Sequence, residues 1–295
     1  MIQLKSLIAA LSLGLAALGA QAQAWKEKYP ELVYANVIGA QGDQLNDRFS
    51  DLLSYLSTEL GVPVKMRNFP NYTALIEAHR NGEVHFASFG ASSYATARTT
   101  GVKTTPFANV VANGSTGYYS VFFVKSSSPY KSIEDLKGKS IGLVDPQSQS
   151  GNIAPRFVLN KLNIKPEEFF NKITYAGSHE KAVLALNNGE VEVIANAWFN
   201  ENSSFLNTMA NSGLVKKDDF RIILKSDILV NGPIAYLDSL PEELKSKITK
   251  TWLDAPIKGK AAWDKSNIGQ SLQAVNHSAY LPVIELNTFV ESLKK

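Results

Sequence analysis

The feature that most limits the fold of this chain is the regular alternation of short β-prone runs with amphipathic helical stripes. Residues 32–37 and 62–66 are β-prone, and between them apolar side chains recur at helical spacing from Leu45 to Leu60. A further β-prone run at residues 84–88 follows a second helical stripe. Repeats of strand, helix and strand favour βαβ units and a largely parallel sheet. The predicted fold class is therefore α/β.

The same alternation begins again in the second half, which predicts two lobes. The later β-prone runs are 119–124, 140–144, 173–175, 191–195 and 221–224. Helices are expected to begin near Gly151, His179 and Ser203. In the tail, we expect helices at 242–253 and 284–293 with loop-like sequence between them. The Ser-rich segment 126–129 and the segment 231–233 (NGP) have the composition of crossings. We expect lobe 1 to comprise residues 25–122 and 233–295 and lobe 2 residues 123–232, with the ligand site in the cleft between them.

The first 24 residues have the pattern of a secretory signal peptide. Lys5 gives a positive start, an apolar stretch runs from Leu7 to Leu18, and small residues then fit the A-x-A cleavage pattern. The apolar stretch is shorter than the roughly 20 residues that span a bilayer. Since the chain has no cysteine, it cannot carry a lipid on an N-terminal Cys. We therefore expect a soluble periplasmic protein, released by cleavage of residues 1–24, that is not a lipoprotein.

Composition excludes several classes of function. Without cysteine there is no thiol nucleophile, disulfide or zinc–thiolate site, and the four histidines are scattered. The formal charge of +3 is too small for an electrostatic nucleic-acid binder. The patterns G-x-S-x-G and H-E-x-x-H and a phosphate-binding glycine loop are all missing from the sequence. We expect a protein that is not an enzyme, uses no cofactor or metal, and binds no nucleic acid.

One local motif predicts an anion site. The segment 144–151 (VDPQSQSG) follows a β-prone run and precedes a helix with Pro155 in its first turn. The N-terminus of a helix has unpaired N–H groups and a partial positive charge. With the hydroxyls of Ser148 and Ser150 it would form a cup of donors for a tetrahedral oxyanion. The same residues also suit an ordinary N-cap with a spare serine, so the motif alone leaves both interpretations open.

The pattern D-P-x-S-x-S-G at 145–151 resembles an element of the periplasmic phosphonate/phosphite/hypophosphite-binding family, the substrate-binding components of ABC importers. Other matching segments follow in the family's order over nearly the whole mature chain. They are 71–78 (NYTALIEA), 82–84 (GEV), 89–94 (FGASSY), 117–121 (GYYSV), 136–139 (LKGK), 177–179 (GSH) and 231–233 (NGP). The resemblance implies a type II periplasmic-binding-protein fold whose two lobes close at a hinge, and an inner-membrane ABC permease as partner. We expect the protein to act as a monomer.

The resemblance also implies a ligand site at the interface of the lobes. Two tyrosines of lobe 1 would line it with hydroxyls and aromatic walls. Three residues at the helix start of lobe 2 would hold oxygens through side chains and backbone amides, and a histidine would donate a ring N–H. These residues are Tyr72 and Tyr94, then Ser148, Gln149 and Ser150, and finally His179.

Departures from the family pattern narrow the predicted ligand. Binders of aminoalkylphosphonates place acidic side chains beside the ammonium group, whereas here one matching position is Gly232 and the segment 196–200 has no carboxylate, although Glu201 follows it. An unpaired ammonium in a closed cleft is costly, which disfavours 2-aminoethylphosphonate. Trp198 and Phe199 favour a small pocket. We expect a small phosphorus oxyanion: phosphite or hypophosphite, then methylphosphonate, with phosphate behind them.

Asp227, just before the second crossing, is a further candidate for the site. A carboxylate there would accept a hydrogen bond from a P–OH group and repel a fully deprotonated oxyanion. A solvated loop aspartate is the other interpretation. The alternatives to this function are the same fold binding phosphate, another phosphonate or a sulfonate, and a sensor partner that binds a receptor instead of a permease.

Overall fold

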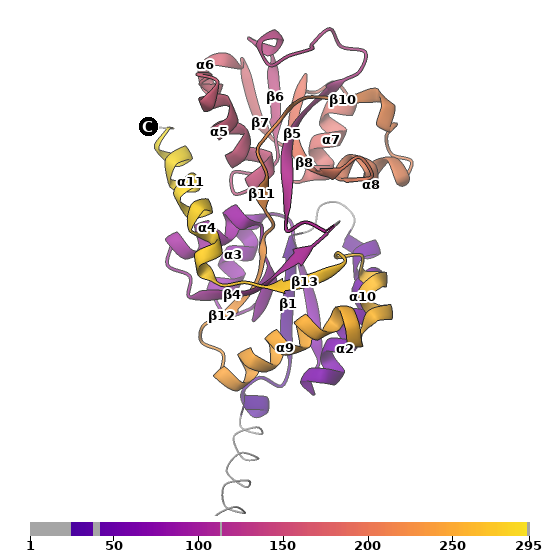
Figure 1. The fold of residues 1–295 in the computed structure, drawn as a ribbon, viewed down its shortest axis with the longest axis vertical. Coiled ribbons are helices and arrows are strands. Elements are labelled where there is room, and N and C mark those ends of the chain that lie inside the picture. The colour runs from indigo at the N-terminus through magenta and orange to yellow at the C-terminus, as the bar shows by residue number, and fades with distance from the viewer. Residues whose placement is uncertain (1–24, 38–41, 113, 294–295) are drawn as a thin grey trace, which may run out of the picture.

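The structure, a computed structural model, describes residues 25–37, 42–112 and 114–293. Its strands form two mixed sheets, one above the other in Figure 1. We call the part of the chain around the six-stranded sheet lobe 1 and the part around the seven-stranded sheet lobe 2. The signal peptide expected over residues 1–24 lies outside the described residues.

The sheet of lobe 1 combines parallel and antiparallel pairs. From edge to edge its strands are β13 (Ser271–Ala274), β4 (Thr104–Val111), β12 (Pro233–Leu237), β3 (Phe86–Ser88), β1 (Leu32–Val37) and β2 (Val64–Phe69). β1 pairs in parallel with β2 and β3, as the βαβ pattern predicted. β12 is antiparallel to β3 and β4, and β13 is antiparallel to β4. The sheet is thus mixed instead of largely parallel, because β4, β12 and β13 join it outside the βαβ units.

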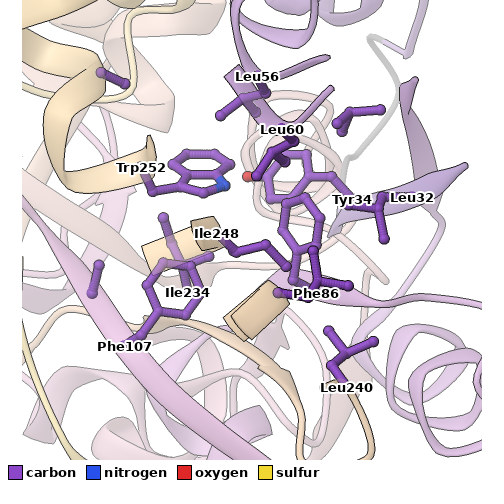
Figure 2. Close-up of a cluster of buried hydrophobic side chains, with 14 of the residues drawn as sticks. Leu32, Tyr34, Leu56, Leu60, Phe86, Phe107, Ile234, Leu240, Ile248 and Trp252 are labelled. Carbon is purple, nitrogen blue, oxygen red and sulfur yellow. The ribbon is translucent and has the colours of Figure 1, made fainter. Parts of the chain in front are cut away.

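Helices cover both faces of this sheet. They are α2 (Gly42–Leu60), α9 (Glu242–Lys258) and α10 (Lys260–Ser266) on one face, and α3 (Tyr72–Arg80), α4 (Ala91–Thr99) and α11 (Leu281–Ser292) on the other. Figure 2 shows the first of these cores, where the rings of Tyr34 and Trp252 lie 5.1 Å apart. Alternation along β1 sends Tyr34 into this core and Ala35 into the second one, as period-2 side chains require.

Lobe 2 repeats the plan around the second sheet. Its strands in order are β10 (Phe220–Lys225), β5 (Gly117–Lys125), β8 (Val193–Asn200), β6 (Ser140–Leu143) and β7 (Lys172–Tyr175), with β11 (Leu229–Val230) on β5 and β9 (Ser203–Ser204) on β8. Its helices are α5 (Ala154–Lys161), α6 (Pro166–Phe169), α7 (His179–Asn187) and α8 (Phe205–Asn211). β6 runs parallel to β7 and β8. The carboxyl ends of β6 and β7 therefore lie on the same side of the sheet, the side that faces lobe 1.

The chain passes between the two sheets twice. It leaves the first sheet after β4 and enters the second at β5, and it returns between β11 and β12. The return falls at Asn231 and Gly232, in the segment where a crossing was expected. The expected lobe limit between residues 122 and 123 falls inside β5, whose nine residues all belong to the second sheet.

The C-terminal tail is more regular than the sequence suggested. α9 continues five residues past Leu253, to Lys258, with Pro256 inside its last turn. α10 and β13 occupy the segment that was expected to be loop-like. Trp263 anchors this segment, because its ring is buried and its Nε1–H donates to the carbonyl of Gly269 at 2.7 Å. Among the described helices, none combines the length and the apolar character needed to cross a bilayer.

Candidate ligand-binding site

The segment 144–151, which we call the cup loop, leaves the carboxyl end of β6 and leads into a helix. The first turn is a π-helix over Gln149–Ile153, and α5 follows it. Ser148 is the N-cap, and its Oγ accepts the N–H of Gly151 at 3.1 Å. The side chains of Ser148, Gln149 and Ser150 are almost fully buried. The motif thus has a real N-cap, which was one of the two interpretations, and it also keeps a second buried hydroxyl at Ser150.

Polar contacts fix the shape of the cup loop. Asp145 Oδ1 accepts the N–H of Gln147 at 2.7 Å, and Asn152 Nδ2 donates to the carbonyl of Pro146 at 2.8 Å. Arg156 Nε donates to Asn152 Oδ1 at 2.9 Å. At Gly151 an added Cβ would lie 2.4 Å from the side chain of Val144, so no larger residue fits without displacing the strand end. The loop is therefore held in one conformation by its own sequence.

Two tyrosine hydroxyls converge on the serines of the cup loop. Tyr72 begins α3 of lobe 1, and its hydroxyl is within hydrogen-bonding reach of Ser148 in lobe 2. Tyr118 of β5 lies in the same relation to Ser150, and burial raises its pKa to about 12. Burial likewise raises the pKa of Tyr72, so both phenols stay protonated and can donate. The two lobes therefore meet at the cup loop through hydroxyl groups.

Tyr118 was not among the site residues predicted from the sequence, although its segment was part of the resemblance. The signal that could have found it is strand alternation, because Tyr118 and Ser120 lie on one face of β5. Ser120 Oγ donates to the carbonyl of Ser150 at 2.6 Å. β5 thus supports the cup loop with two side chains from the same face.

His179 is the first residue of α7, whose N-terminus lies beside the cup loop. Backbone hydrogen bonds of Val144 join the cup loop to the segment before α7. The N–H of Val144 donates to the carbonyl of Gly151, and its carbonyl accepts the N–H of Gly177. The ring of His179 stacks on Phe205 with centroids 4.3 Å apart, and its Nδ1 lies 2.7 Å from Asn196 Oδ1. Burial lowers the pKa of His179 to about 4, so the ring is neutral near pH 7. Nδ1 of His179 is therefore paired with Asn196, which leaves Nε2 as the ring nitrogen that a ligand could meet.

The structure places two of the predicted site residues away from the cup loop. Tyr94 is fully buried in the core of lobe 1, and its hydroxyl oxygen lies 2.8 Å from Nδ1 of His277. Asp227 lies on the surface of lobe 2 with its side chain 88% exposed, and it pairs with Lys161 Nζ at 3.0 Å. We leave both out of the site proposed below.

The residues that departed from the family pattern take different places. The ring of Phe199 stacks on that of Tyr118 at 5.3 Å, so Phe199 lies on the cup side of the second sheet. Trp198 packs against Tyr119 on the opposite face. At Gly232 an added Cβ would lie only 1.9 Å from the carbonyl oxygen of Phe89, so no side chain fits there. An acidic residue at this position is thus excluded by the fold of this chain.

The lobes also touch beyond the cup loop. At the cup loop itself, Thr96 of α4 donates through Oγ1 to Gln147 Oε1 at 2.5 Å. The rings of Phe157 in α5 and Phe289 in α11 meet edge to face at 5.9 Å. Helix α11 of lobe 1 therefore reaches lobe 2, as Figure 1 shows, and the structure is that of a closed pair of lobes.

Within the described residues, no group of His, Asp and Glu side chains is arranged to hold a metal ion. Two α/β lobes joined by two crossings, with a donor-lined helix start between them, define a type II periplasmic binding protein. The chain belongs to the family of periplasmic substrate-binding proteins of phosphonate ABC transporters, whose sequence profile matches residues 39–280. The members of this family are transport proteins and not enzymes.

Individual relatives agree with this assignment. The phosphonates-binding periplasmic protein of Escherichia coli is 28% identical over 278 residues, which covers 90% of this chain and 78% of that protein. The phosphate-import protein PhnD of Mycolicibacterium smegmatis is 26% identical and covers 79% of this chain and 74% of that protein. The structure of PhnD1 from Prochlorococcus marinus in complex with methylphosphonate has a TM-score of 0.77 at 20% identity, covering 88% of this chain and 98% of that one.

Proposed function

We propose that this protein captures a small phosphorus oxyanion in the cleft between its lobes and delivers it to an inner-membrane ABC permease. The site consists of the cup loop, the two tyrosine hydroxyls and the histidine beside them. Its residues are Tyr72, Tyr118, Ser148, Gln149, Ser150 and His179. The observation that carries the proposal is the convergence of tyrosine hydroxyls on the buried serines at the N-terminus of one helix, with Tyr72 coming from the other lobe. Backbone N–H groups and hydroxyls of this kind suit a tetrahedral oxyanion.

The proposed ligand is phosphite or hypophosphite, followed by methylphosphonate. A P–H or P–CH₃ group makes no conventional hydrogen bond, so it would lie against an aromatic wall formed by Tyr118 and Phe199. At the positions where aminoalkylphosphonate binders carry their acidic side chains, an ammonium tail would meet no carboxylate, since Gly232 admits no side chain and Glu201 is exposed. Binding of methylphosphonate by PhnD1 from Prochlorococcus marinus supports this class of ligand.

Phosphate is the second candidate, favoured by the name of the relative in Mycolicibacterium smegmatis. In this chain phosphate would place a polar oxygen against the aromatic wall and lose hydration there. That loss costs about 1–3 kcal/mol, or roughly 5- to 150-fold in affinity. We therefore expect phosphate to bind more weakly than the reduced and methylated oxyanions.

Calorimetric titration of the purified protein tests this ranking. The ligands are phosphite, hypophosphite, methylphosphonate, phosphate and 2-aminoethylphosphonate, each measured at one pH and one salt concentration. We expect saturable binding without turnover, strongest for a reduced oxyanion and weakest for 2-aminoethylphosphonate. Tighter binding of phosphate or of 2-aminoethylphosphonate than of every other ligand would overturn the proposed specificity.

A further inference from the structure

The side chain of Asn196 is fixed in one orientation by two hydrogen bonds. Its Nδ2 donates to the carbonyl of His179 at 2.9 Å, and its Oδ1 accepts the N–H of Ala197 at 2.8 Å. These bonds assign the oxygen and the nitrogen of the amide without reference to the histidine ring. The atom of Asn196 that lies 2.7 Å from His179 Nδ1 is therefore an oxygen, which can only accept.

The acceptor at Nδ1 decides the proton position on the ring. Nδ1 must carry a proton to bond with Asn196 Oδ1, so in the neutral ring Nε2 has a lone pair and no proton. Burial lowers the pKa of His179, which keeps the ring in this neutral form. In the part of the chain that the structure describes, Nε2 has no hydrogen-bond partner. The ring edge opposite Asn196 is thus an acceptor of hydrogen bonds.

The charged groups that act on the Tyr72 hydroxyl are carboxylates, and Arg156, the cation bonded to Asn152 behind the cup loop, is already paired with Glu167. Asp145 of the cup loop and Glu180 of α7 both raise the pKa of Tyr72, so both carboxylates act on the space beside that hydroxyl. The other titratable groups there are Tyr72 itself and Tyr118, which remain neutral because burial raises the pKa of each. The ring of Phe205 from α8 and the uncharged amide of Asn196 from β8 both contact His179.

We propose that the site selects the singly protonated form of its oxyanion, with the ligand's P–OH donating to Nε2 of His179, and that Asn196 is the positioning residue that enforces this. The inference rests on the proposed function and deepens it. It also predicts a difference in affinity between phosphite and hypophosphite, which the sequence did not rank. The monoanion of phosphite has a P–OH group, whereas hypophosphite carries both hydrogens on phosphorus and has none to donate. Phosphite should therefore bind more tightly than hypophosphite.

Two measurements on the unmodified protein test the inference. Calorimetry at about pH 6 should give phosphite an affinity about 10- to 150-fold higher than that of hypophosphite, the range for one hydrogen bond to a charged group. Above the second ionisation of phosphite, its affinity should fall about tenfold per pH unit, because one proton must then be taken up. Nitrogen-15 NMR of the complex should show Nε2 of His179 without a proton, with the signal assigned by its loss in His179→Gln.

Variants isolate the role of Asn196. Asn196→Asp places a carboxylate on Nδ1, which holds the ring as a cation and turns Nε2 into a donor. The preference for phosphite over hypophosphite should then fall about tenfold or more. Asn109→Asp, at another buried asparagine in lobe 1, is the matched control and should leave the preference unchanged.

The outcomes separate this inference from the proposed function. A protonated Nε2 in the NMR spectrum of the complex, or hypophosphite binding as tightly as phosphite to the unmodified protein, would overturn the inference and leave the oxyanion site standing. The NMR result decides the matter even where Asn196→Asp does not fold. Absence of binding by phosphite, hypophosphite and methylphosphonate between about pH 5.5 and about pH 8.5 would overturn the proposed function itself.

Discussion

At the scale of single residues, the cup loop depends on hydroxyl groups, because each hydroxyl can accept one hydrogen bond while donating another. Ser148 uses its acceptor capacity on the N–H of Gly151 and keeps its proton for Tyr72 or a ligand oxygen. Ser150 is buried beside Tyr118 and caps no helix. Ser148 therefore caps a helix and Ser150 does not, whereas both are expected to donate a hydrogen bond to the ligand.

This difference leads to a prediction for alanine variants. Ser150→Ala and Ser148→Ala should each weaken binding of phosphite by about 10- to 150-fold, because each removes one hydrogen bond to a charged ligand, worth about 1.5–3 kcal/mol. Only Ser148→Ala should also lower the free energy of unfolding, by about 1 kcal/mol, since it removes an N-cap. Calorimetry and thermal unfolding measure the two effects separately.

Ser204→Ala is the matched control for the loss of the cap. Ser204 caps α8 by accepting the N–H of Asn207, and it has no described contact with the cup loop. The variant should be destabilised to a similar extent and bind phosphite normally. Unchanged affinity in both Ser148→Ala and Ser150→Ala would remove the cup loop from the site.

At the scale of elements, the π-helical turn and α5 are held to the cup loop through Asn152. This side chain donates to the carbonyl of Pro146 and accepts from Arg156 Nε and from the Tyr175 hydroxyl at 3.1 Å. Asn152→Ala would leave three hydrogen-bonding groups without this partner, one of which, the Arg156 guanidinium, is buried. We expect it to lower the free energy of unfolding by about 1–3 kcal/mol and to weaken phosphite binding, because the loop loses its tether.

The measurement is chemical unfolding together with calorimetry, with Asn188→Ala as control. Asn188 is the C-cap of α7, at the opposite end of the helix from His179. Its side chain donates a hydrogen bond to Glu190. The control should change neither quantity by a comparable amount. Normal phosphite affinity in a destabilised Asn152→Ala would show that the tether serves stability alone.

The elements also show what a sequence can predict and where it stops. α2, β1 and the cup loop were predictable because their signals are contiguous and periodic. Asn196 was not, since its relation to the cup loop depends on the antiparallel pairing of β5 with β8, and Tyr118 could be found only from strand alternation along β5. The burial of Tyr94 could not be predicted from its matching segment either, because nearly the whole of α4 is buried and its hydroxyl is within hydrogen-bonding distance of His277.

At the scale of the whole molecule, each lobe supplies only part of the site. Tyr72 comes from lobe 1, whereas the cup loop, Tyr118 and His179 belong to lobe 2. A ligand that bonds to both lobes stabilises their closed arrangement, because the open arrangement leaves one set of donors unused. Two contacts between the lobes do not involve the ligand and also stabilise the closed arrangement. They are the hydrogen bond of Thr96 with Gln147 and the ring contact of Phe157 with Phe289.

Closure should therefore be visible as a change of shape. We expect small-angle scattering to give a smaller radius of gyration with saturating phosphite than without it. Phe289→Ala removes an apolar contact between the lobes outside the cup loop, so it should enlarge the radius of the free protein and weaken phosphite binding by lowering the closed population. Ile257→Ala, at an exposed residue of α9, is the control and should change neither. An identical radius with and without phosphite, in both the unmodified protein and Phe289→Ala, would rule out hinge closure as the means of capture.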